Sequence, residues 1–299
     1  VQEIAASHAL AAAPLFVFMG AMLERSGTAE RLFEVIHMWT RRLPGGLAVG
    51  TIIMCVLFAA SSGVVGATET VVGMLAIPVM LRHGYDKGLI SGTICAGGSL
   101  GSIIPPSVLV VILSLIAEIG IGDMFAGMLF PGLMLAGLYV LYILIRCGVD
   151  PKIAPRVSEA DDTMPLGAKL RLTLVALLPP IALIFLVLGT ILGGMAVPTE
   201  AASMGAVGAV VLTLLYRNFT WAVFKQSILK TISITAMILS ILLGGTMFSS
   251  VFIGTGGLVA AERAIEVLQL GGWGTLILIL LMAFIAGFVM DVLSIILIV

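Results

Sequence analysis

Charged residues are scarce in this chain of 299 residues: they make up 10% of it, against about 25% in an ordinary soluble domain. Hydrophobic residues make up 60%, and the mean hydropathy is +1.22. So little polar surface cannot cover a soluble globule of this size, which excludes a cytosolic enzyme and a disordered protein. The net charge of −1 leaves no basic patch for nucleic acid, so a nucleic-acid binder is excluded too.

Cysteine is also rare, with only Cys55, Cys95 and Cys147, far apart in the sequence. This spacing gives neither a disulfide framework nor a metal-binding pattern, so we expect small apolar packing residues. The chain begins with Val1 and stops inside the apolar run 296–299, from which we expect a fragment truncated at both ends.

What the sequence does contain is long apolar stretches, several of about 20 residues, the length that crosses a hydrocarbon core of about 30 Å. The stretches are continuous rather than alternating, which favours helices over a membrane barrel. We therefore predict an all-α polytopic membrane protein. The expected helices are Ala5–Leu23, Lys87–Ala117, Met124–Ile145, Leu172–Leu192, Ala201–Leu215 and Ile232–Phe252.

Two further segments are predicted to lie along the membrane interface. In Glu24–Leu43, a charged segment, apolar residues recur at helical spacing: Leu32, Ile36, Trp39 and Leu43. The second such arm is Gly256–Leu270, which carries Glu262, Arg263 and Glu266.

A helical hairpin is predicted between the first arm and the next span. The runs Leu47–Ala60 and Val71–Leu81 are each too short to cross comfortably, and the polar segment Ser61–Thr70 lies between them. We expect a re-entrant hairpin that turns inside the membrane. A pair of full crossings is the alternative.

The basic residues give the orientation of these segments. Threading the chain through the predicted spans places all 15 Lys and Arg on one side except Arg263. The positive-inside rule makes the crowded side cytoplasmic. Two complete crossings at the hairpin would leave this result unchanged.

The order of elements suggests an inverted repeat. Each half has a helix, a glycine-bounded arm, an apolar run and a polar tip, at Ser61-Ser62 in the first and at Asp291 in the second. The predicted halves are 1–147 and 172–299, joined by a cytoplasmic loop at 148–171. Since the two arms fall on opposite faces, the halves have opposite orientation, as in secondary transporters. Chance similarity between two glycine-rich apolar segments is the alternative.

The predicted helix 87–117 carries a break at Gly97–Ser107. Pro105 and Pro106 have no backbone N–H, so they leave the carbonyls of Gly101 and Ser102 without helical donors. Unsatisfied backbone in lipid must face protein, water or a ligand, and gathered neutral oxygens suit Na⁺. A simple proline kink is the alternative. Together with the hairpin tip, the break predicts one cation site with the residues Ser61, Ser62, Gly63, Thr68, Ser99, Gly101, Ser102, Pro105, Pro106 and Ser107.

Asp291 predicts a second cation site, with Met290 and Ser294 beside it. A carboxylate costs about 2.5–3.5 kcal/mol at the centre of a membrane helix, which makes it functional by default. An Asp nearer the interface is the alternative.

Two further acids are candidates for a gating or a structural role. Glu69 lies in the first tip, and Glu200 in the sequence Pro198-Thr199-Glu200. For Glu200 the structural interpretation is a helix start, with Thr199 as the N-cap and the acid in the first turn.

Taken together, these motifs resemble the large membrane subunit of tripartite ATP-independent periplasmic (TRAP) transporters, the DctM type. The matching words follow the family's order over nearly the whole chain: Glu24–Gly27, Ala29–Leu32, Leu43–Ala48, Phe58–Gly63, His83–Asp86, Gly101–Ser107, Pro198–Ala202 and Met290-Asp291. Among these motifs, Ile-Ile-Pro-Pro-Ser and Pro-Thr-Glu-Ala are the ones specific to the family.

The resemblance implies a Na⁺-driven importer in the bacterial inner membrane, with Na⁺ as coupling ion and no ATPase. The implied partners are a small membrane subunit of the DctQ type and a periplasmic substrate-binding protein that delivers an organic acid, such as a dicarboxylate. The implied fold is of the elevator type, in which the hairpins and broken helices move as a block.

Two alternatives stay open at this point. A single-component Na⁺/anion symporter of related architecture would need no binding protein. A membrane-embedded enzyme has less support, because the sequence shows no metal-ligand spacing and no nucleophile beside a base.

Overall fold

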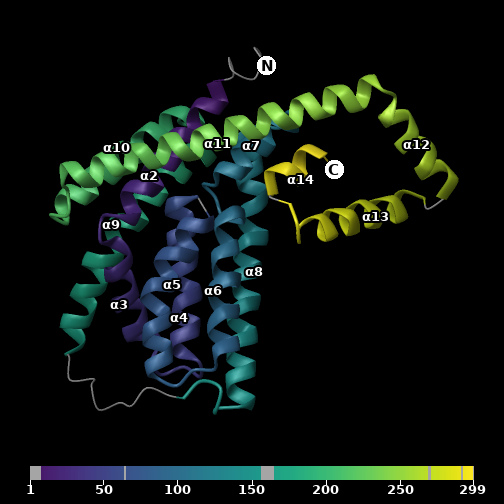
Figure 1. The fold of residues 1–299 in the computed structure, drawn as a ribbon. Coiled ribbons are helices and arrows are strands. Elements are labelled where there is room, and N and C mark those ends of the chain that lie inside the picture. Colours follow the sequence, from purple (N-terminus) through teal and green to yellow (C-terminus); the bar gives the residue numbers. More distant parts are fainter. Residues whose placement is uncertain (1–7, 64, 156–164, 269–270, 291, 299) are drawn as a thin grey trace. The chain divides into compact units, whose positions relative to one another are not determined.

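The computed structural model describes residues 8–63, 65–155, 165–268, 271–290 and 292–298 (Figure 1). The secondary structure of these residues is helical throughout, which confirms the all-α prediction. The elements are η1 (His8–Ala11), α2 (Ala12–Glu24), α3 (Thr28–Thr40), α4 (Gly46–Ser62), α5 (Val65–Arg82), α6 (Lys87–Ile103), α7 (Val108–Ile116), α8 (Ile121–Val149), α9 (Leu166–Leu192), α10 (Pro198–Leu215), α11 (Trp221–Gly254), α12 (Gly257–Leu268), α13 (Gly271–Ala286) and α14 (Val292–Ile298).

The chain divides into two compact units. The described part of one is 8–232 and that of the other is 233–298, so α11 runs from one into the other. This division follows compactness, whereas the predicted halves 1–147 and 172–299 follow an internal repeat. The repeat boundaries therefore stay a prediction.

Membrane-spanning helices occur as the apolar runs predict. Among the described residues, four helices, α8, α9, α10 and α11, are long and apolar enough to cross a membrane, and the α6–α7 pair makes a fifth if it is counted as one span bent by 45°. The chain is thus a polytopic membrane protein.

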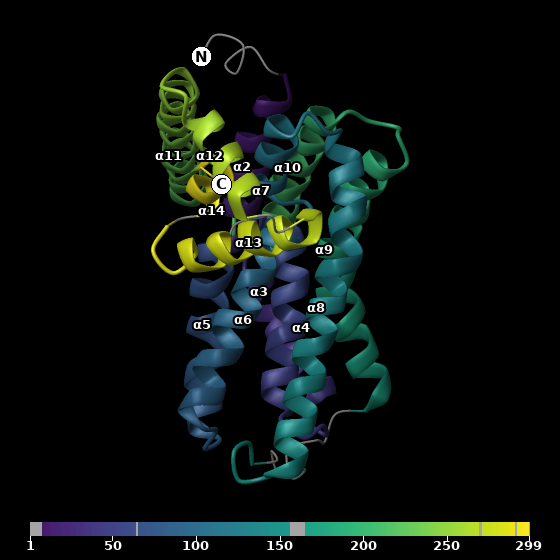
Figure 2. The same ribbon diagram turned by 90° about the vertical axis from the view of Figure 1, so that its right-hand side faces the viewer.

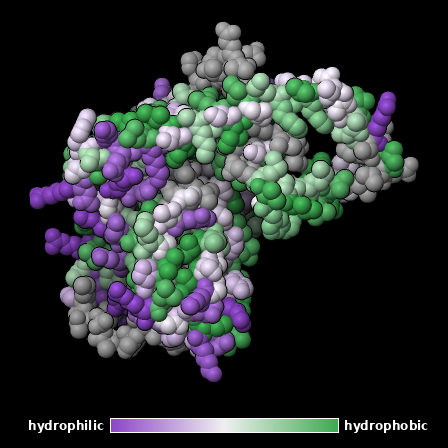
Figure 3. Space-filling model, viewed as in Figure 1, coloured by the Kyte–Doolittle hydropathy of each residue, from purple (hydrophilic) through white to green (hydrophobic). Residues whose placement is uncertain are grey.

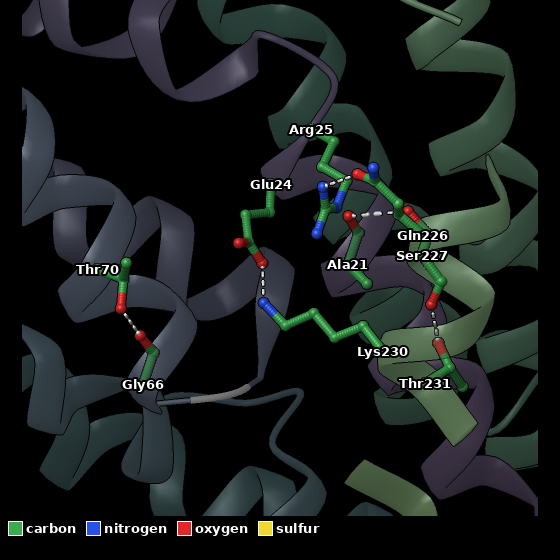
Figure 4. Close-up of polar contacts among 9 residues, drawn as sticks. All are labelled: Ala21, Glu24, Arg25, Gly66, Thr70, Gln226, Ser227, Lys230 and Thr231. Atoms are coloured by element: carbon green, nitrogen blue, oxygen red, sulfur yellow. Dashed lines mark hydrogen bonds and ion pairs between the residues drawn. The ribbon is translucent and has the colours of Figure 1, made fainter. Parts of the chain in front are cut away.

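Helix α11 begins at Trp221, well before the expected start at Ile232. Polar residues in its first turns are tied to the end of α2 (Figure 4): Lys230 pairs with Glu24, and the Ser227 hydroxyl donates to the Ala21 carbonyl at 3.3 Å. Arg25 donates to the Gln226 side chain. Because these contacts give the polar side chains hydrogen-bond partners, the helix includes a polar stretch that hydropathy alone did not assign to it.

Helix α3 is the predicted first arm, with a different buried face. Leu32 and Ile36 are buried as expected, but Trp39 is 50% exposed, and its indole N–H donates to the Thr173 hydroxyl of α9 at 2.9 Å. Leu43 lies beyond the helix and is exposed. The buried stripe instead includes Ala29 and Val35, which complete one face at the i, i+3, i+4 spacing.

Both arms begin and end at glycines with left-handed backbone. Gly27 (φ +76°) precedes α3 and Gly45 (φ +67°) precedes α4, while Gly256 (φ +82°) precedes α12 and Gly271 (φ +64°) is the first residue of α13. Only glycine adopts this conformation without a Cβ penalty. The glycines that bound the predicted arms thus have the same local geometry in both segments.

Helix α4 is part of a buried hydrophobic cluster and contacts α3, α5, α6 and α8 (Figures 1 and 2). Phe58 and Cys55 of α4 are fully buried there. Cys147 is buried too, as predicted, but Cys95 is exposed, so the packing prediction was wrong for that residue. Its position on α6 faces away from the cluster.

The exposed surface of α5 is apolar. Met74, Ile77 and Leu81 are exposed along it, and Figure 3 shows a hydrophobic patch in the middle of this face with hydrophilic residues to its left and below it. An apolar flank bounded by polar ends is what a helix facing lipid requires.

The junction of α3 and α4 yields a prediction about stability. A Cβ at Gly46 would collide with the Thr40 carbonyl oxygen and lie 3.2 Å from the Arg41 Cα, so Gly46→Ala must push the arm away from the hairpin. Overpacking of this kind costs about 1–3 kcal/mol. The melting temperature of the purified permease in detergent should therefore fall.

Gly137→Ala is the matched control, because a Cβ at this exposed helical position meets no heavy atom within 4 Å. It should leave the melting temperature unchanged or raise it slightly, since Ala favours helix over Gly. Equal melting temperatures for both variants would contradict the close packing at Gly46.

A second prediction concerns His37 in the arm. Burial, with smaller effects from the charges of Arg41 and His83, lowers the pKa of His37 from 6.5 to about 4. Below pH 6.5 the unfolded chain takes up this proton before the folded chain does, so stability should fall as the pH drops from 6.5 to 4. Because the ring is only partly buried, solvent screening reduces the full effect to about 1–2 kcal/mol.

Thermal unfolding of the permease at pH values from 4 to 8 measures this loss. His37→Gln should flatten the acid side of the profile, because Gln does not titrate. A profile with the same acid slope in both proteins would assign the pH dependence to other groups.

Candidate functional site

The predicted hairpin is formed by α4 and α5. Helix α4 ends at Gly63, which has a left-handed φ of +62° and donates its N–H to the Ala59 carbonyl at 2.9 Å. The Ser61 hydroxyl donates to the Phe58 carbonyl at 2.8 Å and is buried. The tip is therefore a sharp reversal rather than the longer polar loop expected at Ser61–Thr70, because α5 already begins at Val65.

The predicted break in the next helix is present but shorter than expected. Helix α6 continues to Ile103, and only Ile104–Ser107 are non-helical, with a cis bond between Pro105 and Pro106. Gly97, Gly98 and Gly101 are helical, so the prediction that the break begins at Gly97 was wrong. The two prolines and the residue before them account for the break, since neither proline can donate.

The hairpin tip and the break meet. The Val108 N–H, which starts α7, donates to the Gly63 carbonyl at 3.5 Å. A Cβ at Gly63 would lie 2.6 Å from the Pro106 carbonyl oxygen, so a side chain there would separate the two segments. The tip thus lies beside the break between α6 and α7, and whether the hairpin turns inside the membrane stays a prediction.

The hydroxyl groups of the predicted site bond to backbone carbonyls. Ser99 donates to Ala96, Ser102 donates to Ser99, and Ser107 donates to Ser102, at 2.8, 2.7 and 3.0 Å. Each hydroxyl thereby uses its hydrogen and keeps its oxygen lone pairs. Thr68 is fully buried in the first turn of α5, while the side chain of Ser62 lies outside the described residues.

The two glycines that do not unwind instead allow close contact between helices. A Cβ at Gly97 would lie 3.1 Å from the Cβ of Cys55 in α4. A Cβ at Gly98 would collide with the side chain of Glu69 in α5, and would lie 2.7 Å from its Oε1. Glu69 is therefore a helix residue packed on α6, not a tip residue. Sequence reasoning missed this pairing, because nothing local to Gly98 points to Glu69.

The donor set at the break fits a monovalent cation. The Gly101 carbonyl loses its helical donor to Pro105, and no hydrogen bond among the described residues replaces it. The oxygens of Ser102 and Ser107 lie on the same short segment, and the Glu69 carboxylate lies about one turn away along α6. Unwound carbonyls at a broken helix are the ligands by which transporters hold Na⁺.

The predicted second cation site is described only in part. Helix α13 ends at Ala286, a turn follows at Gly287–Met290, and α14 begins at Val292. Met290 is in this turn and Ser294 is in the first turn of α14, whereas Asp291 lies outside the described residues. A turn thus occurs where the second tip was predicted.

The Glu200 side chain caps the start of its own helix. Helix α10 begins at Pro198 with Val197 as its N-cap, and the Glu200 carboxylate accepts from the Val197 N–H at 3.2 Å. The first-turn acid was predicted, but Thr199 is not the N-cap: with proline at the first helical position, the N-cap is Val197, two residues earlier. This contact gives Pro198 and Glu200 a structural role, and Thr199 receives a hydrogen bond from Ser203 at its carbonyl.

Comparison with known proteins adds to this geometry. The family described as "Tripartite ATP-independent periplasmic transporter, DctM component" matches residues 1–299. The chain is 33% identical over 301 aligned positions to the C4-dicarboxylate TRAP transporter large permease protein DctM of Pseudomonas aeruginosa, covering 99% of this chain and 68% of that protein.

Other relatives are named for other cargo. The ectoine/5-hydroxyectoine TRAP transporter large permease protein of Ruegeria pomeroyi is 29% identical, over 97% of this chain and 66% of that protein. The isethionate TRAP transporter permease protein DctMQ of Oleidesulfovibrio alaskensis is 31% identical, over 82% of this chain and 38% of that protein. The chain thus spans two thirds or less of the length of most of these relatives.

The bond between Ser107 and Ser102 gives a prediction for the break. Ser107→Ala leaves the Ser102 carbonyl without a donor in a buried place, which costs about 1–3 kcal/mol. The melting temperature of the permease should fall accordingly. Ser91→Ala is the control, because the Ser91 hydroxyl bonds the Gly88 carbonyl on an exposed part of the same helix. Should both variants melt alike, the Ser107 bond contributes nothing to the break.

Proposed function

The chain belongs to the DctM-component family of TRAP transporters, and on this premise we propose that it is the permease of a Na⁺-driven importer of a small organic acid. It is a multi-pass protein of the inner membrane. Its relatives are named as permeases rather than as enzymes. The partners that we propose are a small membrane subunit of the DctQ type and a periplasmic binding protein.

The coupling ion is proposed to bind where the hairpin tip meets the helix break. The observation that carries this proposal is the contact of Gly63 with Pro106 and Val108, which gathers backbone and hydroxyl oxygens inside a span. In this proposal Gly101, Ser102 and Ser107 supply ligands. Ser99 is close to these residues in sequence, and Ser61 is close to the hairpin tip. Met290, Asp291 and Ser294 are the proposed second set. Bound Na⁺ would supply positive charge against which an organic acid can bind.

An elevator movement is supported by the packing inside the unit 8–232. Helices α4, α5 and α6 approach one another closely at Gly97 and Gly98. Helices α2, α9 and α10 do the same, because a Cβ at Gly205 would lie 2.6 Å from the Met19 Sδ and 2.8 Å from a Val187 methyl. Small residues at helix contacts let backbones pack tightly in membranes. In the proposed movement, the closely packed group α4, α5 and α6 would be the moving block, and the closely packed group α2, α9 and α10 would be the stationary frame.

The organic-acid substrate is the least constrained part of the proposal. The relatives are named for C4-dicarboxylates, ectoine and isethionate, so the family alone leaves the cargo open. Much of the selection would belong to the binding protein, which captures the substrate before the permease receives it.

Uptake in reconstituted vesicles tests the proposal. With the small subunit and the binding protein present, a Na⁺ gradient should drive accumulation of a C4-dicarboxylate or another organic acid. Ser61→Ala and Ser102→Ala should each raise the Na⁺ concentration for half-maximal uptake by about tenfold, which corresponds to about 1.4 kcal/mol of lost ion binding. Ser91→Ala, on the exposed start of α6, should leave it unchanged.

Three results would contradict the proposal in different ways. Uptake that does not depend on the Na⁺ gradient would show that Na⁺ is not the coupling ion. Unchanged Na⁺ dependence in both site variants would show that Na⁺ binds elsewhere in the protein. Uptake by the permease without any binding protein would identify a single-component symporter.

A further inference from the structure

A cavity of about 560 Å³ lies at the end of α6 remote from the break. It is bounded by the first turns of α6, the last turns of α8, one residue of α4 and Ile153. Along α6, its lining runs from Asp86 to Ala96, which is five residues before Gly101, or roughly 7.5 Å. The charged end of the cavity is thus the end farther from the proposed ion site, and its volume is in the range of small-molecule sites.

One end of the cavity carries an acid and a base. Asp86 is the N-cap of α6: its Oδ1 accepts from the Leu89 N–H at 3.1 Å, and its own N–H donates to the Ile153 carbonyl at 2.9 Å. Arg146 is in the last turn of α8 and is exposed. Among the residues that the structure describes, no ion pair joins Asp86 to Arg146. Both charges therefore remain available to a ligand, and together they match a zwitterion.

Further along α6, a buried hydroxyl lacks a partner. Thr93 lines the cavity and is 4% exposed, yet its Oγ1 has no hydrogen bond among the described residues. Thr93 is seven residues after Asp86, or roughly 10 Å along the helix. A buried polar group without a partner is costly, so this hydroxyl indicates a polar ligand atom at that depth.

The remaining wall is mostly apolar and reaches an exposed face of α8. Ile52, Leu89 and Ile143 contribute apolar surface, and a Cβ at Gly92 would meet nothing within 4 Å. Leu138, at the far end, is 51% exposed on a helix that spans the membrane. Helices α6 and α8 contact each other, and Figure 1 shows them side by side, with the start of α6 and the end of α8 both in the lower part of the view.

We propose that this cavity binds one molecule of phosphatidylethanolamine. Its phosphate would lie at Arg146, its ammonium group at Asp86, an ester oxygen at Thr93, and an acyl chain along Gly92 toward Leu138. An anionic lipid leaves Asp86 unmatched, and a choline headgroup has no N–H to donate to a carboxylate. A soluble zwitterion leaves the apolar part of the cavity unfilled.

Native mass spectrometry of the purified, delipidated permease tests the proposal with three lipids of equal chain length: phosphatidylethanolamine, phosphatidylglycerol and phosphatidylcholine. The first should bind about tenfold more tightly than the other two, the effect of one charge-assisted hydrogen bond. Asp86→Asn should abolish this preference while keeping the helix start, because Asn is an equally good N-cap. Arg146→Gln should weaken all three lipids.

Filling the cavity gives an independent test. Gly92→Leu places a side chain in its open space and should lower the affinity for phosphatidylethanolamine about tenfold or more. Gly127→Leu makes the same chemical change in α8, where a Cβ also meets nothing within 4 Å and the residue does not line the cavity. It should bind lipid as the unaltered permease does, and melting temperatures confirm that both variants are folded.

Several results would overturn the proposal. Equal binding of the three lipids, or a preference for phosphatidylethanolamine that remains in Asp86→Asn, would contradict the assignment of the ammonium group to Asp86. Tighter binding of phosphatidylglycerol would make the cavity an anionic-lipid site instead. Binding of glycerophosphoethanolamine, which has no acyl chains, as tightly as the lipid would mean that the cavity takes a soluble ligand.

Discussion

The structure around the hairpin depends on one constraint: a backbone polar group inside the hydrocarbon region needs a partner. Pro105 and Pro106 remove two donors from the ladder of α6, and among the described residues the chain replaces one of them. Ser107 donates its hydroxyl back to the Ser102 carbonyl, and the tip carbonyl of Gly63 accepts from Val108. The break and the tip are thus satisfied partly by each other. The oxygens left over, such as that of Gly101, are what a cation would use in the proposed site.

How far the sequence predicts this arrangement depends on whether the signal is local. The proline pair places the break within a few residues, because the missing N–H groups act on the same helix. Glycine carries no such single meaning. Gly97 and Gly98 look like places to unwind, but they are helical and admit Cys55 and Glu69, which lie about 30 to 40 residues earlier in the chain. Which partner a glycine admits is decided by tertiary packing, and no local pattern records it.

The arms show the same division between local and tertiary information. Their bounding glycines are predictable, because a left-handed residue is a property of one position, and all four have positive φ. The buried face of α3 is not, since Trp39 satisfies the helical spacing yet points to Thr173 of α9. Helix α11 is longer than its hydropathy indicates for a related reason: Glu24 and Arg25 supply the partners that make Lys230 and Gln226 acceptable in a helix.

Helix α6 joins two different requirements at its ends. Near Ile104 the chain is irregular and leaves a carbonyl oxygen without its helical donor. In the proposed elevator movement, the charged start of the helix near Asp86 would change depth together with the block that contains it. An N-cap that also holds a lipid ammonium group would serve the second requirement, because the lipid would travel with the helices that enclose it. Arg146 and Asp86 would then keep their polar partner in both positions of the block, and the cost of moving charged side chains through the headgroup region would not recur in each cycle. On this argument, phosphatidylethanolamine bound at α6 and α8 would affect the rate of movement more than the affinity for Na⁺.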